Sequence, residues 1–121
     1  MAQTYIDFQK KIYSLLTGDP ALVAKVTGVF DVVPEEQTAP YVVIDTIQAL
    51  EGSLINDTER LISVDLHIWS AYQGKKEVLE IAELIEAVLP ADLRTENLIV
   101  LQDPSDWYHG IFTIRGYIRR V

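Results

Sequence analysis

One stretch, residues 61–89, constrains the fold of this chain more than any other, because it joins a strand pattern directly to a helix pattern. Over residues 61–70 apolar and polar side chains alternate, which is the period of a β-strand with one buried face. From Lys75 apolar residues recur at helical spacing up to Leu89, and Pro90 ends the pattern. The helix must bury its apolar stripe, and the apolar face of the strand is the nearest cover. The stretch therefore predicts a helix packed on a sheet and leaves the function open.

Two helices are predicted before the first strand. Residues 4–16 carry a helical apolar stripe, with Thr4 as the N-cap and Asp7 as the third following residue of a capping box. Gly18 ends this helix. A second, short helix begins at Asp19 and Pro20, which suit the N-cap and the first helical position, and it reaches about Lys25 or Val26.

The remaining segments predict strands. A short extended piece covers residues 29–34, and further strands cover residues 41–48, 98–102 and 107–121, the last with Gly110 and Gly116 as signs of a bulge or a close backbone approach. Residues 90–97 form a turn-rich connection. The element order is helix, helix, strand, strand, strand, helix, strand, strand. We expect one α+β domain spanning residues 1–121, with a largely antiparallel sheet of about four strands and the helices packed on one face.

Composition excludes several classes of protein. At 121 residues and 49% apolar content the chain can bury a real core, so disorder is not expected. The absence of cysteine excludes disulfides, thiolate metal sites and cysteine nucleophiles, and it fits a reducing cytosol. The N-terminal residues show no signal-peptide pattern, and no apolar run approaches the roughly 20 residues that span a bilayer. We therefore expect no membrane association.

The charge of the chain is −8, with 18 acidic against 10 basic residues. Its one basic cluster is Arg115, Arg119 and Arg120, which we interpret as the solvated end of the last strand and not as a nucleic-acid patch. Residues 31–59 hold seven carboxylates and no Lys or Arg. Such a segment repels anions, meets a basic partner, or simply keeps the surface soluble.

Few residues are candidates for chemistry. His67 and Asp65 lie two apart on the polar side of the central strand, as an acid–base dyad would, but no motif supplies a nucleophile. Asp103, Asp106 and His109 have metal-ligand chemistry at a spacing of three, but they surround a turn in which Asp is favoured for backbone reasons. No phosphate-binding loop or nucleophile elbow occurs. We therefore predict no catalytic residue, no cofactor and no metal site.

Aromatic and aliphatic residues in polar surroundings indicate contacts with other proteins instead. The aromatic residues lie at strand ends or on polar strand faces, and exposed aromatics are enriched at interfaces; they are Trp69, Tyr72, Trp107, Tyr108 and Tyr117. The alternative is that these rings are half-buried within the domain. Residues 49–58 mix turn formers with Leu50, Leu54 and Ile55, which either pack on the domain's own core or dock on a neighbouring subunit.

An ordered set of short motifs resembles the tail-completion proteins of long-tailed bacteriophages and their relatives in prophages and gene transfer agents. The set covers nearly the whole chain and consists of a Leu-Thr-Gly-Asp step at residues 16–19, Val-Phe-Asp-Val-Val-Pro at 29–34, Ala-Pro-Tyr-Val-Val-Ile at 39–44, Val-Asp-Leu-His-Ile-Trp-Ser at 64–70, Ile-Ala at 81–82 and His-Gly at 109–110. The resemblance implies a structural virion protein, a tail terminator that assembles as a ring, generally a hexamer, at the head-proximal end of the tail tube.

The resemblance also implies the partners. They are further copies of the chain, the tail tube protein and a connector or stopper protein of the head and neck, while DNA passes through the channel without specific binding. The implied location is the virion, and the host cytoplasm during assembly. Residues 49–58 are then expected to become ordered in the ring. Two alternatives stay open, namely another neck or minor tail morphogenesis protein, and a small ligand-binding or enzymatic α+β domain.

Overall fold

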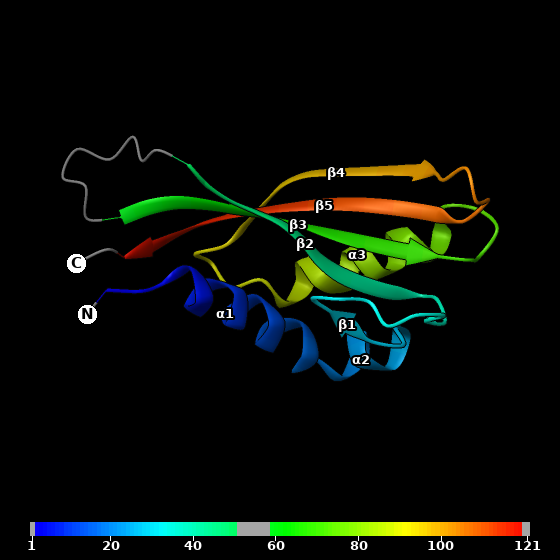
Figure 1. Cartoon of the computed structure of the whole chain (residues 1–121), viewed down its shortest axis with the longest axis horizontal. Helices are drawn as coiled ribbons and strands as arrows, with labels where there is room; N and C mark the ends of the chain where they lie inside the picture. The colour runs from blue at the N-terminus through cyan, green and yellow to red at the C-terminus, as the bar shows by residue number, and fades with distance from the viewer. Residues whose placement is uncertain (1, 51–58, 120–121) are drawn as a thin grey trace.

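A five-stranded sheet forms one layer of the molecule and three helices form the other (Figure 1). The computed structural model describes residues 2–50 and 59–119. The elements in chain order are α1 (Tyr5–Thr17), α2 (Pro20–Lys25), β1 (Val29–Phe30), β2 (Tyr41–Leu50), β3 (Glu59–Ser70), α3 (Lys76–Val88), β4 (Arg94–Gln102) and β5 (Tyr108–Arg119). The strand order across the sheet is β1-β2-β3-β5-β4. The predicted α+β class and the predicted order of elements are confirmed.

Local signals explain where the first two helices begin. The Thr4 hydroxyl accepts a hydrogen bond from the Asp7 backbone N–H at 3.0 Å, and the Asp7 carboxylate accepts one from the Thr4 N–H at 2.8 Å. This is the predicted capping box, and it satisfies two backbone donors that the helix itself leaves unpaired. Asp19 caps α2 by accepting from the Leu22 N–H at 2.9 Å, with Pro20 in the first turn as predicted.

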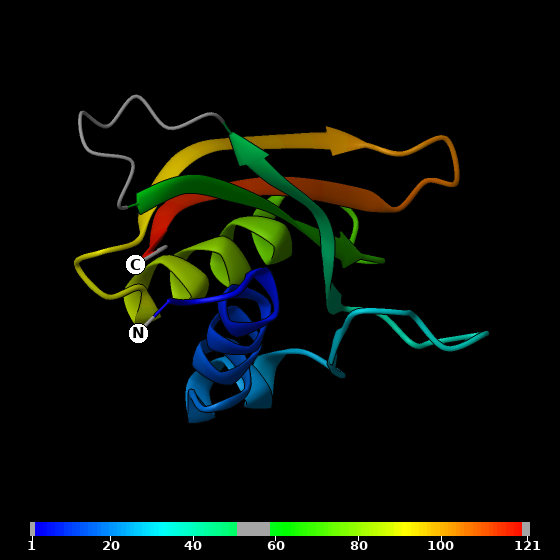
Figure 2. The ribbon, with the colours of Figure 1, turned by 60° about the vertical axis from the view of Figure 1, so that its left-hand side comes forward.

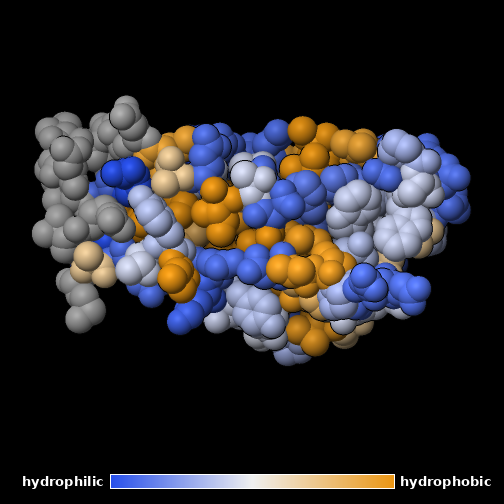
Figure 3. All heavy atoms as spheres, viewed as in Figure 1, coloured by the Kyte–Doolittle hydropathy of each residue, from blue (hydrophilic) through white to orange (hydrophobic). Residues whose placement is uncertain are grey.

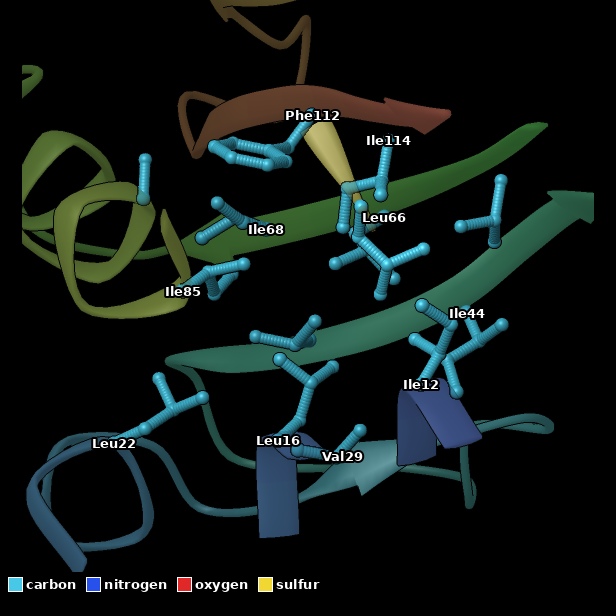
Figure 4. Packing of buried hydrophobic residues seen from close by; sticks show 14 of the residues in the cluster. Ile12, Leu16, Leu22, Val29, Ile44, Leu66, Ile68, Ile85, Phe112 and Ile114 are labelled. Atoms are coloured by element: carbon cyan, nitrogen blue, oxygen red, sulfur yellow. The ribbon is translucent and has the colours of Figure 1, made fainter. Parts of the chain in front are cut away.

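The core lies between the sheet and the helices, and the period-two pattern of β3 places it there. Ile62, Val64, Leu66 and Ile68 are fully buried. The helical stripe of α3 covers them with Val78, Ile81 and Ile85, which are also fully buried. Figure 4 shows Leu66, Ile68, Phe112 and Ile114 pointing from the sheet toward the helices. The predicted packing of the third helix on the central strand is therefore confirmed.

Two glycines in β5 allow this close packing. A Cβ on Gly110 would lie 2.5 Å from Cγ1 of Val78, and a Cβ on Gly116 would lie 2.5 Å from Cδ2 of Leu93. The pairing of β5 with β3 runs without a register shift through both positions. Of the two explanations that the sequence allowed for these glycines, close approach is the correct one.

The structure corrects the sheet in three places. It has five strands and not about four, because the short piece at residues 29–30 pairs parallel with β2 at Val42 and Val43. β2 continues to Leu50, so Ala49 is a strand residue and not part of an irregular segment. β4 begins at Arg94, so half of the predicted connection at residues 90–97 is strand. Among the described residues no helix has the length and apolarity needed to cross a membrane.

Candidate interaction surface

One face of the sheet carries no helix in the described part of the chain. Figures 1 and 2 show all three helices on the opposite side. Side chains on the uncovered side alternate with the core residues and line up across the strands according to the register. We call this surface the open face and define it by Tyr41, Val43, Gln48, Leu50, Leu61, Ser63, Asp65, His67, Trp69, Ile99, Leu101, His109, Ile111, Thr113, Arg115 and Tyr117.

Aromatic rings occupy one end of the open face. The Trp69 ring stacks on the His109 ring with centroids 3.9 Å apart and planes inclined by 8°. Tyr41 lies next to Trp69 across β2 and β3, and it meets the Trp107 ring edge-on at 6.3 Å. Burial raises the pKa of the Tyr41 hydroxyl. These rings therefore partly cover one another, and Tyr41, Trp69 and Trp107 stay half-exposed.

Two histidines lie inside this aromatic group. Nε2 of His109 is 2.9 Å from Nδ1 of His67, and Nε2 of His67 is 3.5 Å from the Asp45 carboxylate. Burial lowers the pKa of His109, and the neighbouring His67 lowers it further, while Asp103 and Asp45 act in the opposite direction. The lowered pKa favours the neutral form of the His109 ring, in which one ring nitrogen donates and the other accepts.

The possible dyad of Asp65 and His67 does not form. The Asp65 carboxylate accepts a hydrogen bond from the Thr113 hydroxyl at 2.7 Å, so its partner is on β5. His67 contacts Asp45 of β2 instead. Residues two apart in a strand are about 6.6 Å apart, whereas directly opposite residues on neighbouring strands are about 5 Å apart. The partners of both groups therefore come from neighbouring strands.

The turn with Asp103 and Asp106 is organised by its own backbone. The Asp103 carboxylate accepts hydrogen bonds from the Ser105 N–H at 3.0 Å and the Ser105 hydroxyl at 2.7 Å, and these bonds lower the pKa of Asp103. Asp106 adopts a left-handed conformation with φ of 71°. Within residues 2–50 and 59–119 no group of three or more His, Asp or Glu side chains is placed to hold a metal ion.

The predicted basic cluster lies among acidic groups. Arg115 forms an ion pair with Glu96 at 2.7 Å. A hollow of about 660 Å³ beside it carries side chains of both signs, among them Glu59, Asp92, Arg94, Arg115 and Arg119. Arg120 lies outside the described residues. This mixture of signs is unlike the uniformly positive surface that nucleic-acid binding requires.

The residues predicted to contact partners fall into three groups. Tyr72 and Tyr117 are 49% and 50% exposed, as a contact role requires. Trp69, Trp107 and Leu50 are half-buried, the two tryptophans against neighbouring rings and Leu50 opposite Leu61 at the end of β2. Leu54 and Ile55 lie outside the described residues. The contact role of all these residues stays a prediction.

Sequence reasoning missed two exposed aliphatic residues on β4. Ile99 is 46% exposed and Leu101 is 37% exposed, although both belong to an unbroken apolar run of four residues. Figure 3 shows apolar side chains gathered along the upper margin of the molecule, over β4. The run was visible in the sequence, but an apolar run of this length is also typical of a strand buried on both faces. These side chains are exposed because they lie on the open face and because β4 is at the edge of the sheet.

Comparison with known proteins gives a family and two similar structures. The family model of tail completion protein gp17 matches residues 10–119. No curated protein matches the chain significantly. A chain in the virion of a native gene transfer agent particle has a TM-score of 0.79 at 19% identity, covering 89% of this chain and 91% of that one. The gp17 protein of bacteriophage SPP1 has a TM-score of 0.61 at 22% identity, covering 93% of this chain and 88% of that one. At these identities the two structures establish a shared fold.

Proposed function

This chain belongs to the tail completion protein gp17 family, and we propose that it forms a ring at the head-proximal end of a phage-type tail tube and joins the tail to the head. A structural role in tail completion, and with it a place in the virion, follows from the family. The single observation that carries the proposal is the family match over residues 10–119, which includes every strand of the sheet. The ring and the head–tail joint are the proposed part.

The chemistry of the open face supports a structural role over a catalytic one. Several of its polar groups are paired with other side chains, as Asp65 is with Thr113 and Arg115 is with Glu96. The paired histidines contact each other, the Asp45 carboxylate and the Trp69 ring. We propose that the protein has no catalytic activity and that His67 and Asp65 are dispensable for any chemistry. A hydrolytic activity of the pure protein that disappears in His67→Ala would overturn this.

The charge of the chain suits a ring around a DNA channel. A net charge of −8 repels the phosphate backbone, so the passing duplex would not adhere to the lumen. We propose that DNA passes without specific binding. In this arrangement the partners of the ring are the tail tube protein on one side and a connector or stopper protein of the neck on the other.

Assembly on purified tail tubes tests the proposal. Native mass spectrometry of the protein with and without tubes, together with electron microscopy of the tubes, should show a closed oligomer bound at one end of each tube. Removal of the gene from a producing phage or particle should give tails that lack heads, and the intact gene supplied in trans should restore attachment. A protein that stays monomeric and leaves both tube ends bare would refute the proposal. Binding to filled heads without tubes would reassign the protein to the neck.

A further inference from the structure

The sheet has two edges that no strand covers within the described residues. On one side β4 pairs only with β5. On the other side β1 pairs with β2 only at Val42 and Val43, so residues 45–50 of β2 have β3 as their single strand neighbour. An uncovered edge presents backbone N–H and C=O groups to another chain. Folded proteins normally protect such edges against pairing with other chains by charged residues, proline or bulges. An edge without these features is therefore a candidate for pairing with a partner strand.

The edge formed by β4 is protected over its first half only. Arg94, Glu96 and a register shift between Thr95 and Asn97 lie in that half, and both charges and bulges discourage strand addition. Residues 98–102 carry no charge, no proline and no register shift. This second half also exposes Ile99 and Leu101. It therefore has the features of a strand that accepts a partner strand.

The free part of β2 is built in the same way. Asp45 and a register shift between Ile44 and Ile47 are followed by residues 47–50, which have no charge and no proline. Ile47 is exposed, and together with Tyr5 and Ile6 it lines a groove of about 310 Å³ beside α1. The two free edges thus resemble each other, and each combines unpaired backbone with exposed aliphatic side chains.

Strand directions make the two edges complementary. The pairs β2–β3, β3–β5 and β5–β4 are all antiparallel, so β4 runs opposite to β2. If a second copy in the same orientation is placed beside the first, its β2 continues the antiparallel alternation next to β4. Such a contact uses different surfaces on the two copies, and repeated contacts of this kind close into a ring when the rotation permits.

We propose that residues 98–102 of one copy pair antiparallel with residues 47–50 of the next copy, and that this strand addition builds the ring. The inference rests on the proposed function, since it names the surfaces that the ring would use. The partner of each free edge is a second copy of this chain, because the two edges are similar in length, uncharged and apolar, and run in opposite directions.

The register within one copy adds a geometrical consequence. Ile99, Ile111, His67 and Val43 form one row across the sheet, so residues 98–102 are level with the part of β2 that β1 covers. Pairing with residues 47–50 therefore requires each copy to slide along the strand direction relative to its neighbour. Strands in a closed sheet are tilted and staggered for the same reason, so the slide is compatible with a ring.

Disulfide cross-linking tests the proposal, and the absence of native cysteine gives it a clean background. Positions 99 and 101 on β4 and positions 48 and 50 on β2 all lie on the open face. Single variants Ile99→Cys or Leu101→Cys would be mixed with Gln48→Cys or Leu50→Cys under the conditions in which rings form. Each chain then carries a single cysteine, so no bridge can form within one copy. Every cross-link therefore reports a contact between copies.

We expect at least one of the four mixtures to convert a large share of the chains to covalent dimer. The ceiling is about half of the chains, because in an equal random mixture only one neighbour in two carries the second cysteine. The single variants alone should give little. Cross-links between two copies of Ile99→Cys would indicate a two-fold contact and overturn the proposal. Rings that form without a cross-link in any mixture would also overturn it, while leaving the proposed ring intact. The unmodified protein is the control for the proposed function. If native mass spectrometry detects no ring when it is mixed with tail tubes, the proposed function itself is refuted.

A charge variant gives a second, independent readout. Ile99→Lys places a charge on the unprotected half of β4 and should raise the concentration needed for ring formation at least tenfold without lowering the melting temperature. The matched control is Leu79→Lys, because Leu79 is 42% exposed but lies on α3. Equal effects of the two variants on assembly would contradict the assignment of β4.

Discussion

The two faces of the sheet are built from the same strands but by different interactions. Toward the helices, Ile62, Val64, Leu66 and Ile68 of β3 are fully buried, and every one is aliphatic. Toward the open face, the residues between them are Ser63, Asp65 and His67. A single strand thus serves an apolar core and a polar surface because its side chains alternate.

The comparison shows that sequence controls the two faces in different ways. The helix-covered face is held by close packing, so the volume and the apolar character of each side chain matter there. The open face is held by specific pairs such as Asp65 with Thr113 and His67 with His109, so the identity of each partner matters. Substitutions on the two faces should therefore differ in how much they lower the free energy of unfolding.

Leu66→Asp should unfold the monomer. The side chain is fully buried against the core, and an unpaired carboxylate there costs about 5 kcal/mol or more, which is comparable to the whole free energy of unfolding. Circular dichroism of the purified variant would show the loss of the folded signal. Ile99→Asp, on the open face, should change the free energy of unfolding by less than about 1 kcal/mol. Similar losses of free energy of unfolding in both variants would show that the two faces do not differ in their tolerance of a charged side chain.

Gly110→Ala should lower the free energy of unfolding by about 1–3 kcal/mol, because its new methyl group would overlap Cγ1 of Val78. The double variant with Val78→Ala separates overlap from other causes, since it removes the atom in question. In the Val78→Ala background the same glycine change should cost little or nothing. Urea denaturation of the four proteins in this cycle measures the coupling, and additive costs would show that the helix does not approach the strand closely.

Thr113→Val should lower the free energy of unfolding by about 1 kcal/mol. The change keeps the shape of the side chain but removes the hydroxyl that donates to the Asp65 carboxylate at 2.7 Å. Thr113→Ser retains the donor and serves as the control. If the two variants were equally stable in urea denaturation, the hydrogen bond would contribute nothing to the open face.

A change of pH should have the smallest effect. The pKa of His109 lies below its usual 6.5 in the folded protein, mainly because of burial. Above pH 6.5 the residue is neutral in both the folded and the unfolded chain, so its full contribution to stability is present. As the pH falls below 6.5 the unfolded chain binds a proton first, and this contribution is lost until the pH reaches the lower pKa of the folded state. The loss between pH 7.5 and pH 5.5 should be smaller in His109→Gln than in the native chain. An equal loss of stability in both proteins would show that protonation of His109 does not contribute to the pH dependence of folding.

The periodic and capped parts of this fold could be predicted from the sequence. The alternation in β3, the stripe of α3 and the capping box of Thr4 and Asp7 depend on neighbours close in sequence, and all three are confirmed. The start of β4 could not be predicted in this way. Thr95, Glu96 and Asn97 lie at an edge and are polar throughout, so they show no alternation.

The pairs on the open face could not be predicted either. The contacts of His67 with His109 and Asp45 depend on the register between strands that are far apart in sequence. The register shift between Ile44 and Ile47 changes the face on which the following residues of β2 lie, and the local sequence does not show this shift. The part played by Leu54 and Ile55 in assembly stays a prediction, because both lie outside the described residues.

The first and last described parts of the chain are tied together by two hydrogen bonds. The Gln3 N–H donates to the Arg119 carbonyl at 2.6 Å, and the Arg119 N–H donates to the Gln3 side-chain oxygen at 2.7 Å. Residues 3 and 119 therefore lie side by side, so the same packing could form from a chain whose elements are joined there and opened elsewhere. A circularly permuted gene, joined by a short linker here and opened between Pro104 and Ser105, would begin with β5 and keep every strand beside its present neighbours.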